Sequence, residues 1–112
     1  MNIHLTDKKC VACEGGIPPL TKEEISAFKP QVPVWEVSSD AKSISRQFVF
    51  KDFKEALAFV NKVGAIAEEE GHHPDIKLFE YKNVLVTLFT HAINGLSEND
   101  FILAAKIDTL PI

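Results

Sequence analysis

The stretch FKEALAFVNKVGAIAEEEGHHPDIKLFEYKNVLVTLFTH, residues 53–91, decides the fold, because its hydrophobic spacing changes from the period of a helix to that of a strand. Its first part repeats small and apolar residues every three or four positions, at Phe53, Ala56, Leu57, Val60, Val63, Gly64 and Ala67. Asp52 to Glu55 has the composition of a helix N-terminal cap, and Gly71 suits a left-handed residue after the last turn. The pattern predicts a helix from 53 to about 69.

The second part of the stretch alternates in the manner of strands. Residues 76–81 and 84–91 predict a hairpin that turns at Lys82-Asn83. Alternation in the second strand places four side chains on each face: Leu85, Thr87, Phe89 and His91 on one, and Val84, Val86, Leu88 and Thr90 on the other. A helix followed by a hairpin with one apolar face predicts a helix layer packed on a sheet.

The chain before this stretch has the same plan. Residues 1–19 are polar and rich in glycine and proline, so we expect an irregular leader. A capping-box pattern at Thr21 to Glu24 predicts a short helix through about Phe28, which the prolines after it end. Residues 34–37 predict a first strand, and residues 38–40 a turn.

A second strand follows that turn, and a last helix closes the chain. Ile44, Phe48 and Phe50 share one face of the strand, on which Arg46 is the exception. Ser97 and its neighbours predict the start of a helix that runs to about Ile107. The predicted order is α-β-β-α-β-β-α in a single domain, residues 1–112, of the α+β class. We expect an antiparallel sheet with the three helices packed on one face.

Composition excludes several classes of function. The net charge is −4 and the isoelectric point about 5.5, which disfavours a nucleic-acid partner. No apolar run approaches the ~20 residues that span a bilayer, and the first nine residues have no apolar core of a signal peptide. We therefore expect a cytoplasmic protein without a membrane partner.

The two cysteines, Cys10 and Cys13, form one CxxC. A structural zinc site normally needs four ligands, and a redox CxxC normally opens a helix after a strand, whereas glycines and prolines follow here. Three interpretations stay open: an inert or weakly metal-binding reduced pair, zinc completed by other ligands such as His4, and redox chemistry. The first is favoured.

Histidines concentrate in one region, at His72, His73 and His91. The adjacent pair follows a helix C-terminus, where positive charge is favoured, and Pro74 biases His73 toward an extended conformation. Imidazole gives and accepts protons near neutral pH, so the cluster indicates acid–base catalysis. Simple helix capping and a three-histidine metal site are the alternatives, but neighbouring side chains diverge, which makes the metal site awkward.

Three further residues are candidates on spacing alone. Glu68 lies about one turn before His72 and could orient an imidazole, or could belong to a solvated acidic helix end. Asp100 lies where an acid caps a helix. Trp35 is the one tryptophan and could pack in the core or stack on a flat ligand.

Together these residues resemble the pterin-4a-carbinolamine dehydratase family, also called 4a-hydroxytetrahydrobiopterin dehydratase. The family pattern is an acid, three residues, His-His-Pro, an aromatic, a His and an Asp. It is matched here by Glu68, His72-His73-Pro74, Tyr81, His91 and Asp100. Residues 48–53, 87–91 and 95–100 are also similar to the family, and residues 10–20 resemble the leader of bacterial members.

The resemblance implies a fold and an activity. The fold would have a four-stranded antiparallel sheet with helices on one side, in a homodimer or homotetramer. The reaction would be dehydration of 4a-hydroxytetrahydropterin to quinonoid dihydropterin, which supports aromatic amino acid hydroxylases by recycling tetrahydrobiopterin. No metal and no organic cofactor would take part. Some animal members also serve as dimerisation cofactors of a transcription factor, so a protein-interaction module is the alternative function.

The resemblance also implies site residues. The three histidines would carry the proton transfers, with their division of roles open. Glu68 would orient the histidine pair, and Trp35 would wall the flat pterin. Contacts to the edges of the pterin would come from the loop and strand-end residues Pro74, Asp75, Thr90 and Ala92, with Asp100 also in the site.

Association is expected from the residues themselves. The helix at 53–69 and the run Phe101 to Ala105 in the last helix carry more apolar surface than one small sheet can cover. Apolar patches of this kind mark contacts between chains, and closed symmetric oligomers are the common result. We therefore expect a dimer or tetramer.

Overall fold

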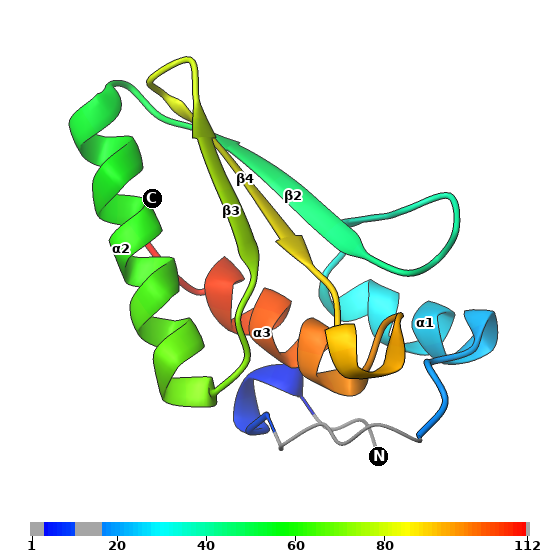
Figure 1. The fold of residues 1–112 in the computed structure, drawn as a ribbon. Coiled ribbons are helices and arrows are strands. Elements are labelled where there is room, and N and C mark those ends of the chain that lie inside the picture. Colours follow the sequence, from blue (N-terminus) through cyan, green and yellow to red (C-terminus); the bar gives the residue numbers. More distant parts are fainter. Residues whose placement is uncertain (1–3, 11–16, 112) are drawn as a thin grey trace.

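The computed structural model describes residues 4–10 and 17–111 (Figure 1). The helices and strands follow the predicted order: α1 (Lys22–Phe28), β1 (Glu36–Val37), β2 (Ile44–Val49), α2 (Phe53–Glu70), β3 (Asp75–Phe79), β4 (Asn83–Leu88) and α3 (Glu98–Asp108). Short 3-10 turns add η1 (Leu5–Asp7), η2 (Lys29–Gln31) and η3 (His91–Ile93). The four strands form one antiparallel sheet in the order β1-β2-β4-β3. The predicted α+β class is confirmed.

The helix caps of α1 and α2 form at the positions predicted from the sequence. Thr21 and Glu24 make a complete capping box at the start of α1. The Asp52 carboxylate accepts the Glu55 N–H at the start of α2, and Gly71 ends α2 at φ 68°. That left-handed conformation favours glycine because a Cβ would clash with the backbone there. The caps fix both ends of α2, and with them the position of the histidine pair that follows.

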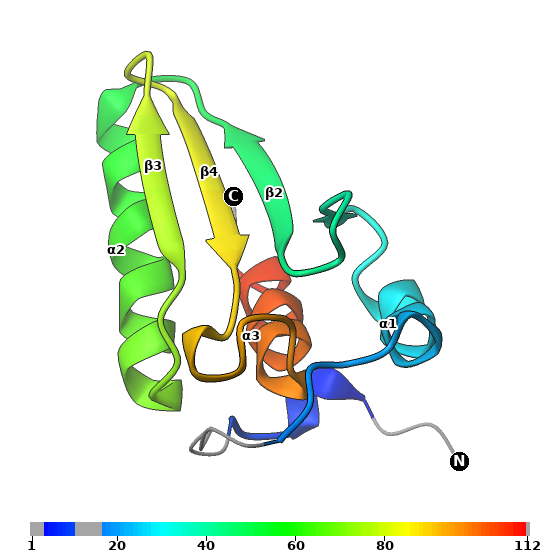
Figure 2. The same ribbon diagram turned by 45° about the vertical axis from the view of Figure 1, so that its right-hand side comes forward.

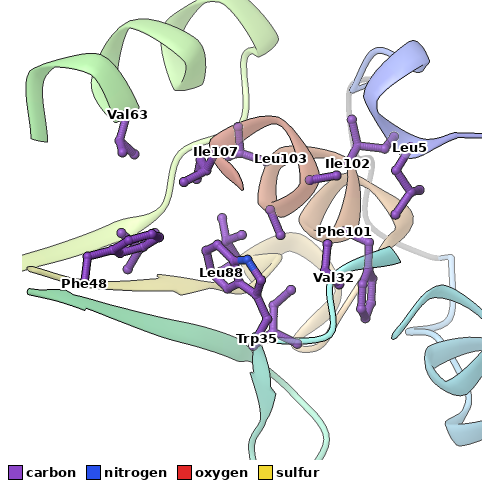
Figure 3. Packing of buried hydrophobic residues seen from close by; sticks show 14 of the residues in the cluster. Leu5, Val32, Trp35, Phe48, Val63, Leu88, Phe101, Ile102, Leu103 and Ile107 are labelled. Atoms are coloured by element: carbon purple, nitrogen blue, oxygen red, sulfur yellow. The ribbon is translucent and has the colours of Figure 1, made fainter. Parts of the chain in front are cut away.

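Helices α2 and α3 cover the same face of the sheet, with α2 along β3 and β4 (Figures 1 and 2). The core lies between these layers and includes Trp35, Phe48, Leu88 and Phe101 (Figure 3). Helix α1 adds Phe28, whose ring stacks on Phe101 of α3 at 5.4 Å between centroids. Within the described residues, no helix is long and apolar enough to cross a membrane.

The inward-facing charge on β2 has a partner in the structure. The Arg46 guanidinium donates to Asp108 Oδ1 at 2.6 Å and lies 4.4 Å from the Phe48 ring centroid. Asp108 also accepts the Trp35 Nε1–H at 2.9 Å. Arg46 can therefore share the inward face of β2 with apolar side chains, because Asp108 of α3 provides a carboxylate partner for its charge.

The hairpin turn differs from the prediction. Phe79 pairs with Asn83, so the turn comprises residues 80–82, and Asn83 opens β4. Glu80 and Tyr81 take positive φ angles of 47° and 55°. Asn83 instead donates to the Phe79 carbonyl and accepts from Gln47 Nε2. An asparagine expected in the turn thus bridges the strands.

Three other boundaries also differ from expectation. Strand β1 holds only Glu36–Val37 and β4 ends at Leu88, so His91 begins η3 instead of ending a strand. The leader contains η1, whose Leu5 is buried and contacts the α3 layer.

The apolar run Phe101 to Ala105 of α3 is buried within the chain. The expectation that α3 carries surplus apolar surface was therefore wrong, because η1 and α1 cover it.

Candidate active site

The loop after α2 and the start of α3 meet at a hydrogen bond between His72 and Asp100. His72 Nε2 lies 2.6 Å from Asp100 Oδ1, and the two side chains are 11% and 0% exposed. A carboxylate that accepts from Nε2–H fixes the ring orientation and leaves Nδ1 to exchange protons. The spacing argument gave Asp100 a capping role, and the structure adds contact with a histidine.

Asp100 is itself held by two donors on its other oxygen. Thr90 Oγ1–H donates to Asp100 Oδ2 at 2.7 Å, and the Ser97 N–H donates to the same atom at 3.0 Å. The Ser97 hydroxyl lies a further 2.8 Å from Thr90 Oγ1. Thr90 is itself buried. The resemblance implied that Thr90 contacts substrate, but its hydroxyl is already engaged in positioning the carboxylate.

The second histidine of the pair has a different carboxylate partner. His73 Nε2 lies 2.5 Å from Glu68 Oε2, and both side chains are largely exposed. Glu68 therefore contacts His73, one member of the pair that the resemblance implied it would orient, although His72 is the one that lies one turn after it. The left-handed Gly71 explains this outcome, because it turns the chain between the helix end and the histidines.

His91 lies opposite the pair, at the start of η3. Its ring is exposed and meets the Phe89 ring edge-on, with centroids 4.5 Å apart. An open pocket of about 250 Å³ is lined by His91 and Phe89 together with the histidine pair. Its other lining residues are Gly71, Thr90 and Ala92. The three predicted histidines thus border one pocket. Phe89 was not predicted, although it shares a strand face with His91 in the alternating pattern.

Trp35 lies outside this pocket. Its side chain is fully buried in the core (Figure 3). Its Nε1–H donates to Asp108, at the other end of α3 from Asp100. The distance along eight helical residues is about 12 Å. The structure therefore places Trp35 in the core, as one of its two interpretations had it, and Trp35 does not line the histidine pocket. Phe89 is the aromatic ring that the pocket offers.

Cys10 contacts the last residue of α2, just before the loop that carries the histidine pair. Its N–H donates to Glu70 Oε1 at 2.9 Å and its thiol to the Asn99 carbonyl at 3.6 Å. Burial, with the nearby Glu70 charge, raises the pKa of the Cys10 thiol to about 12. A thiol of this kind is a poor nucleophile and a poor metal ligand at neutral pH. Cys13 lies outside the described residues, so the CxxC interpretations remain predictions.

Across residues 4–10 and 17–111, no three His, Cys, Asp or Glu side chains converge on a point that could hold a metal ion. His72 and His73 are instead bound to separate carboxylates. The arrangement is therefore one of oriented imidazoles around an open pocket.

Fold and pocket together define a small α+β protein with three histidines around one open pocket. The family model for pterin 4 alpha carbinolamine dehydratase matches residues 18–110, and the chain belongs to that family. A Rubrobacter xylanophilus relative named "Putative pterin-4-alpha-carbinolamine dehydratase" is 51% identical, over 95% of this chain and 97% of the relative. A Methylococcus capsulatus protein of the same name is 52% identical, over 95% and 92%.

Two solved structures are similar to this one. A transcriptional coactivator/pterin dehydratase from Brucella melitensis matches with a TM-score of 0.74 and 34% identity, over 80% of this chain and 95% of that one. A pterin dehydratase-like protein identified as a RuBisCO assembly factor in the alpha-carboxysome matches with a TM-score of 0.56 and 27% identity, over 66% and 84%.

Proposed function

We propose that this chain is a hydro-lyase that dehydrates a 4a-hydroxytetrahydropterin to quinonoid dihydropterin. One observation carries the proposal: His72, His73 and His91 border a single open pocket, and two of the three are oriented by carboxylates. Membership of the dehydratase family supports it. The expected setting is cytoplasmic recycling of tetrahydrobiopterin for aromatic amino acid hydroxylases.

The reaction needs one acid and one base near neutral pH. The C4a–O bond breaks as a proton reaches the leaving oxygen, and water departs. The N5–H bond gives up its proton to a base, and its electron pair forms the C4a=N5 double bond. A cationic imidazole and a neutral imidazole on one pocket supply both transfers, each worth about 10²–10⁴ in rate.

The three histidines differ in how they could act. His73 and His91 are exposed at the pocket and can reach a bound ligand, so we assign the proton transfers to them. His72 is largely buried and anchored by Asp100, so it presents one fixed ring edge to the ligand. Glu68 orients His73, and Phe89 offers an apolar wall for a flat ring.

The other proposed contacts are to the edges of the pterin. Ala92 lines the pocket beside His91, and Pro74 follows the histidine pair directly. Thr90 and Asp100 act one layer deeper by holding His72. No metal or organic cofactor has a step in this mechanism, because both half-reactions are proton transfers.

A protein-interaction module is the second candidate function. Two observations favour it: the solved relatives include one described as a transcriptional coactivator and another described as a RuBisCO assembly factor. A scaffold role alone, however, does not require carboxylates that orient two imidazoles at one pocket.

A dehydratase assay on the purified chain tests the enzyme proposal. We expect the wild-type protein to accelerate loss of water from 4a-hydroxytetrahydropterin, and the double variant His73→Ala/His91→Ala to lose that acceleration while keeping its circular dichroism spectrum. An inactive wild-type protein with an intact fold would refute the proposal and favour the interaction module.

A further inference from the structure

The leader is fastened to the rest of the chain just before it reaches the histidine site. Its turn η1 lies beside α3 (Figures 1 and 2). Leu5 is buried in the core, and its N–H donates to Gln31 Oε1 at 2.8 Å. Lys8 Nζ donates to Glu98 Oε2, at the first residue of α3, at 2.6 Å. These contacts fix the position of the residue that follows them, Cys10.

Cys10 contacts both of the segments that carry the buried histidine–carboxylate pair. Its N–H donates to Glu70 Oε1 at 2.9 Å, and its thiol donates to the Asn99 carbonyl at 3.6 Å. Glu70 lies two residues before His72, and Asn99 lies directly before Asp100. One residue of the leader therefore joins the two pieces of backbone whose side chains form the hydrogen bond between His72 and Asp100.

Both contacts of Cys10 are in the required protonation state at neutral pH. Burial, followed by the charges of Glu70 and Asp100, raises the pKa of the Cys10 thiol to about 12, so the thiol keeps the proton that it donates. Burial opposes ionisation of Glu70, but hydrogen bonds from Lys106 and Cys10, with the Lys106 charge, lower its pKa below the usual value. The acceptor is therefore a carboxylate.

The His72–Asp100 hydrogen bond depends on how α2 and α3 sit against each other. The His72 amide is bonded to a carbonyl of α2, and Asp100 is held at the start of α3, so each partner is fixed to its own helix. Hydrogen bonds weaken steeply with distance and angle, so the two helix ends must also be fixed to each other. The Glu70–Lys106 ion pair ties the end of α2 to a later turn of α3, and Cys10 ties it to the first turn.

We infer that Cys10 is a positioning residue of the histidine site, because it holds the end of α2 against the start of α3 and so keeps His72 bonded to Asp100. Cys10 does not line the histidine pocket and has no part in proton transfer. Its role requires a reduced thiol and no metal. The expected effect on dehydration rests on the proposed function, whereas the expected effect on the His72 ring does not depend on any reaction.

Nuclear magnetic resonance of protein with isotope-labelled histidine tests the inference at the His72 ring. The proton on His72 Nε2 is identified by its loss in His72→Gln. We expect Cys10→Ala to speed the exchange of this proton with water about two- to tenfold, the worth of one weak hydrogen bond, and to lower kcat/KM for dehydration by a similar factor.

Cys10→Ser is the variant that separates positioning from packing. It keeps a donor for the Asn99 carbonyl, so it should restore most of the slow exchange and most of the rate. A side chain that acted only by packing would give the reverse order, because a hydroxyl costs more to bury than a methyl group. If Cys10→Ala does not fold, Cys10→Thr and Cys10→Val repeat the comparison with two side chains of equal shape.

Val63→Ala is the matched control for loss of stability. Val63 is fully buried beneath the middle of α2 (Figure 3), so its truncation destabilises the fold without touching either end of the helix. It should leave the exchange of the His72 ring proton unchanged. Equal acceleration in Val63→Ala and Cys10→Ala would overturn the inference, as would wild-type exchange in Cys10→Ala.

Two further outcomes count against the inference. One is a Cys10→Ser protein that behaves no better than Cys10→Ala. The other is a wild-type His72 ring proton already lost to fast exchange, which would show that the pair is not held. A wild-type protein without dehydratase activity, but with the expected exchange rates in every variant, would refute the proposed function and leave Cys10 as the residue that holds the pair.

Discussion

Asp100 and His72 lie 28 residues apart in the chain and are joined by a hydrogen bond of 2.6 Å between Oδ1 and Nε2. The other carboxylate oxygen accepts from Thr90 and from the Ser97 amide at the start of α3. One buried carboxylate therefore caps a helix and orients an imidazole. The capping contacts hold it in a single orientation, which is what a group that positions a histidine requires.

Replacing Asp100 by Asn separates these two roles. The amide oxygen of Asn can still accept from Ser97, but its NH₂ group would face His72 Nε2 and stabilise the opposite tautomer. We expect a loss of dehydration rate of about 10–100-fold, the worth of one hydrogen bond to a charged group, because His72 positions the ligand and does not transfer a proton. The free energy of unfolding should fall by only about 1–2 kcal/mol, measured by urea denaturation.

Thr90→Val is the companion variant. It removes the hydroxyl that donates to Asp100 and keeps the shape of the side chain. The rate should fall less than in Asp100→Asn, because the Ser97 amide still holds the carboxylate. Wild-type rates in both variants would remove Asp100 from the mechanism and leave it as a helix cap.

His73 and His91 should be separable by single substitutions. His73→Ala and His91→Ala should each lower the dehydration rate by about 10²–10⁴, because each removes one proton transfer. Full activity in both folded variants would end the acid–base assignment.

Sequence periodicity and cap chemistry predicted the elements of this fold well. Periodicity and caps are properties of short segments of sequence. In α2, for example, the capping residues Asp52 and Gly71 lie directly beside the two ends that they define. The turn at residues 80–82 was missed because Asn83 resembles a turn residue, and only cross-strand contacts to Phe79 and Gln47 explain its place in β4. Contacts of this kind, between segments far apart in the chain, cannot be predicted from local sequence patterns.

The same distinction applies to the site. Three histidines were found because their chemistry is unusual in itself, and they do border one pocket. Their partners were less predictable: Glu68 binds His73, because the left-handed Gly71 changes the direction of the chain. Trp35 could be predicted either as a core residue or as a ligand platform, and its hydrogen bond to Asp108 of α3 could not be predicted from spacing. Which side chain forms a hydrogen bond with which depends on tertiary packing, and the spacing of residues in the sequence does not reveal that packing.

A buried ion pair fixes the end of α2 just before the histidines. Lys106 Nζ donates to Glu70 Oε2 at 2.7 Å, with side chains 18% and 4% exposed. Burial opposes ionisation of Glu70, but the Lys106 and Cys10 hydrogen bonds and the Lys106 charge together lower its pKa below 4.5. Its contribution to stability is therefore present above pH 4.5 and is lost as the pH falls through the lowered pKa.

We expect Glu70→Gln to lower the free energy of unfolding by about 2–4 kcal/mol at pH 7, because it leaves the Lys106 ammonium half-buried without a counter-charge. In a Lys106→Met background the same change should cost much less. Urea denaturation of the four proteins completes the double-mutant cycle. Equal costs in both backgrounds would show that Glu70 acts through its contact with the Cys10 amide alone.

Activity should survive exhaustive chelation. Thiolate is the form of cysteine that binds metals, and the raised pKa of Cys10, about 12, keeps its thiol protonated at neutral pH. The histidine pair is divided between Glu68 and Asp100. Dialysis against a chelator, followed by elemental analysis and the dehydratase assay, checks this prediction. Stoichiometric zinc whose removal abolishes activity would contradict it.

The outer side of α2 is the surface on which we expect this chain to associate. Phe53 and Leu57, one helical turn apart, are 51% and 44% exposed, whereas the apolar residues of α3 are buried. Exposed apolar side chains at this spacing suit a helix–helix contact between copies, in a dimer or tetramer. Light scattering at low micromolar concentration should therefore give a multiple of 12.5 kDa, and Phe53→Asp/Leu57→Asp should reduce it. A wild-type monomer with full dehydratase activity would show that α2 needs no partner.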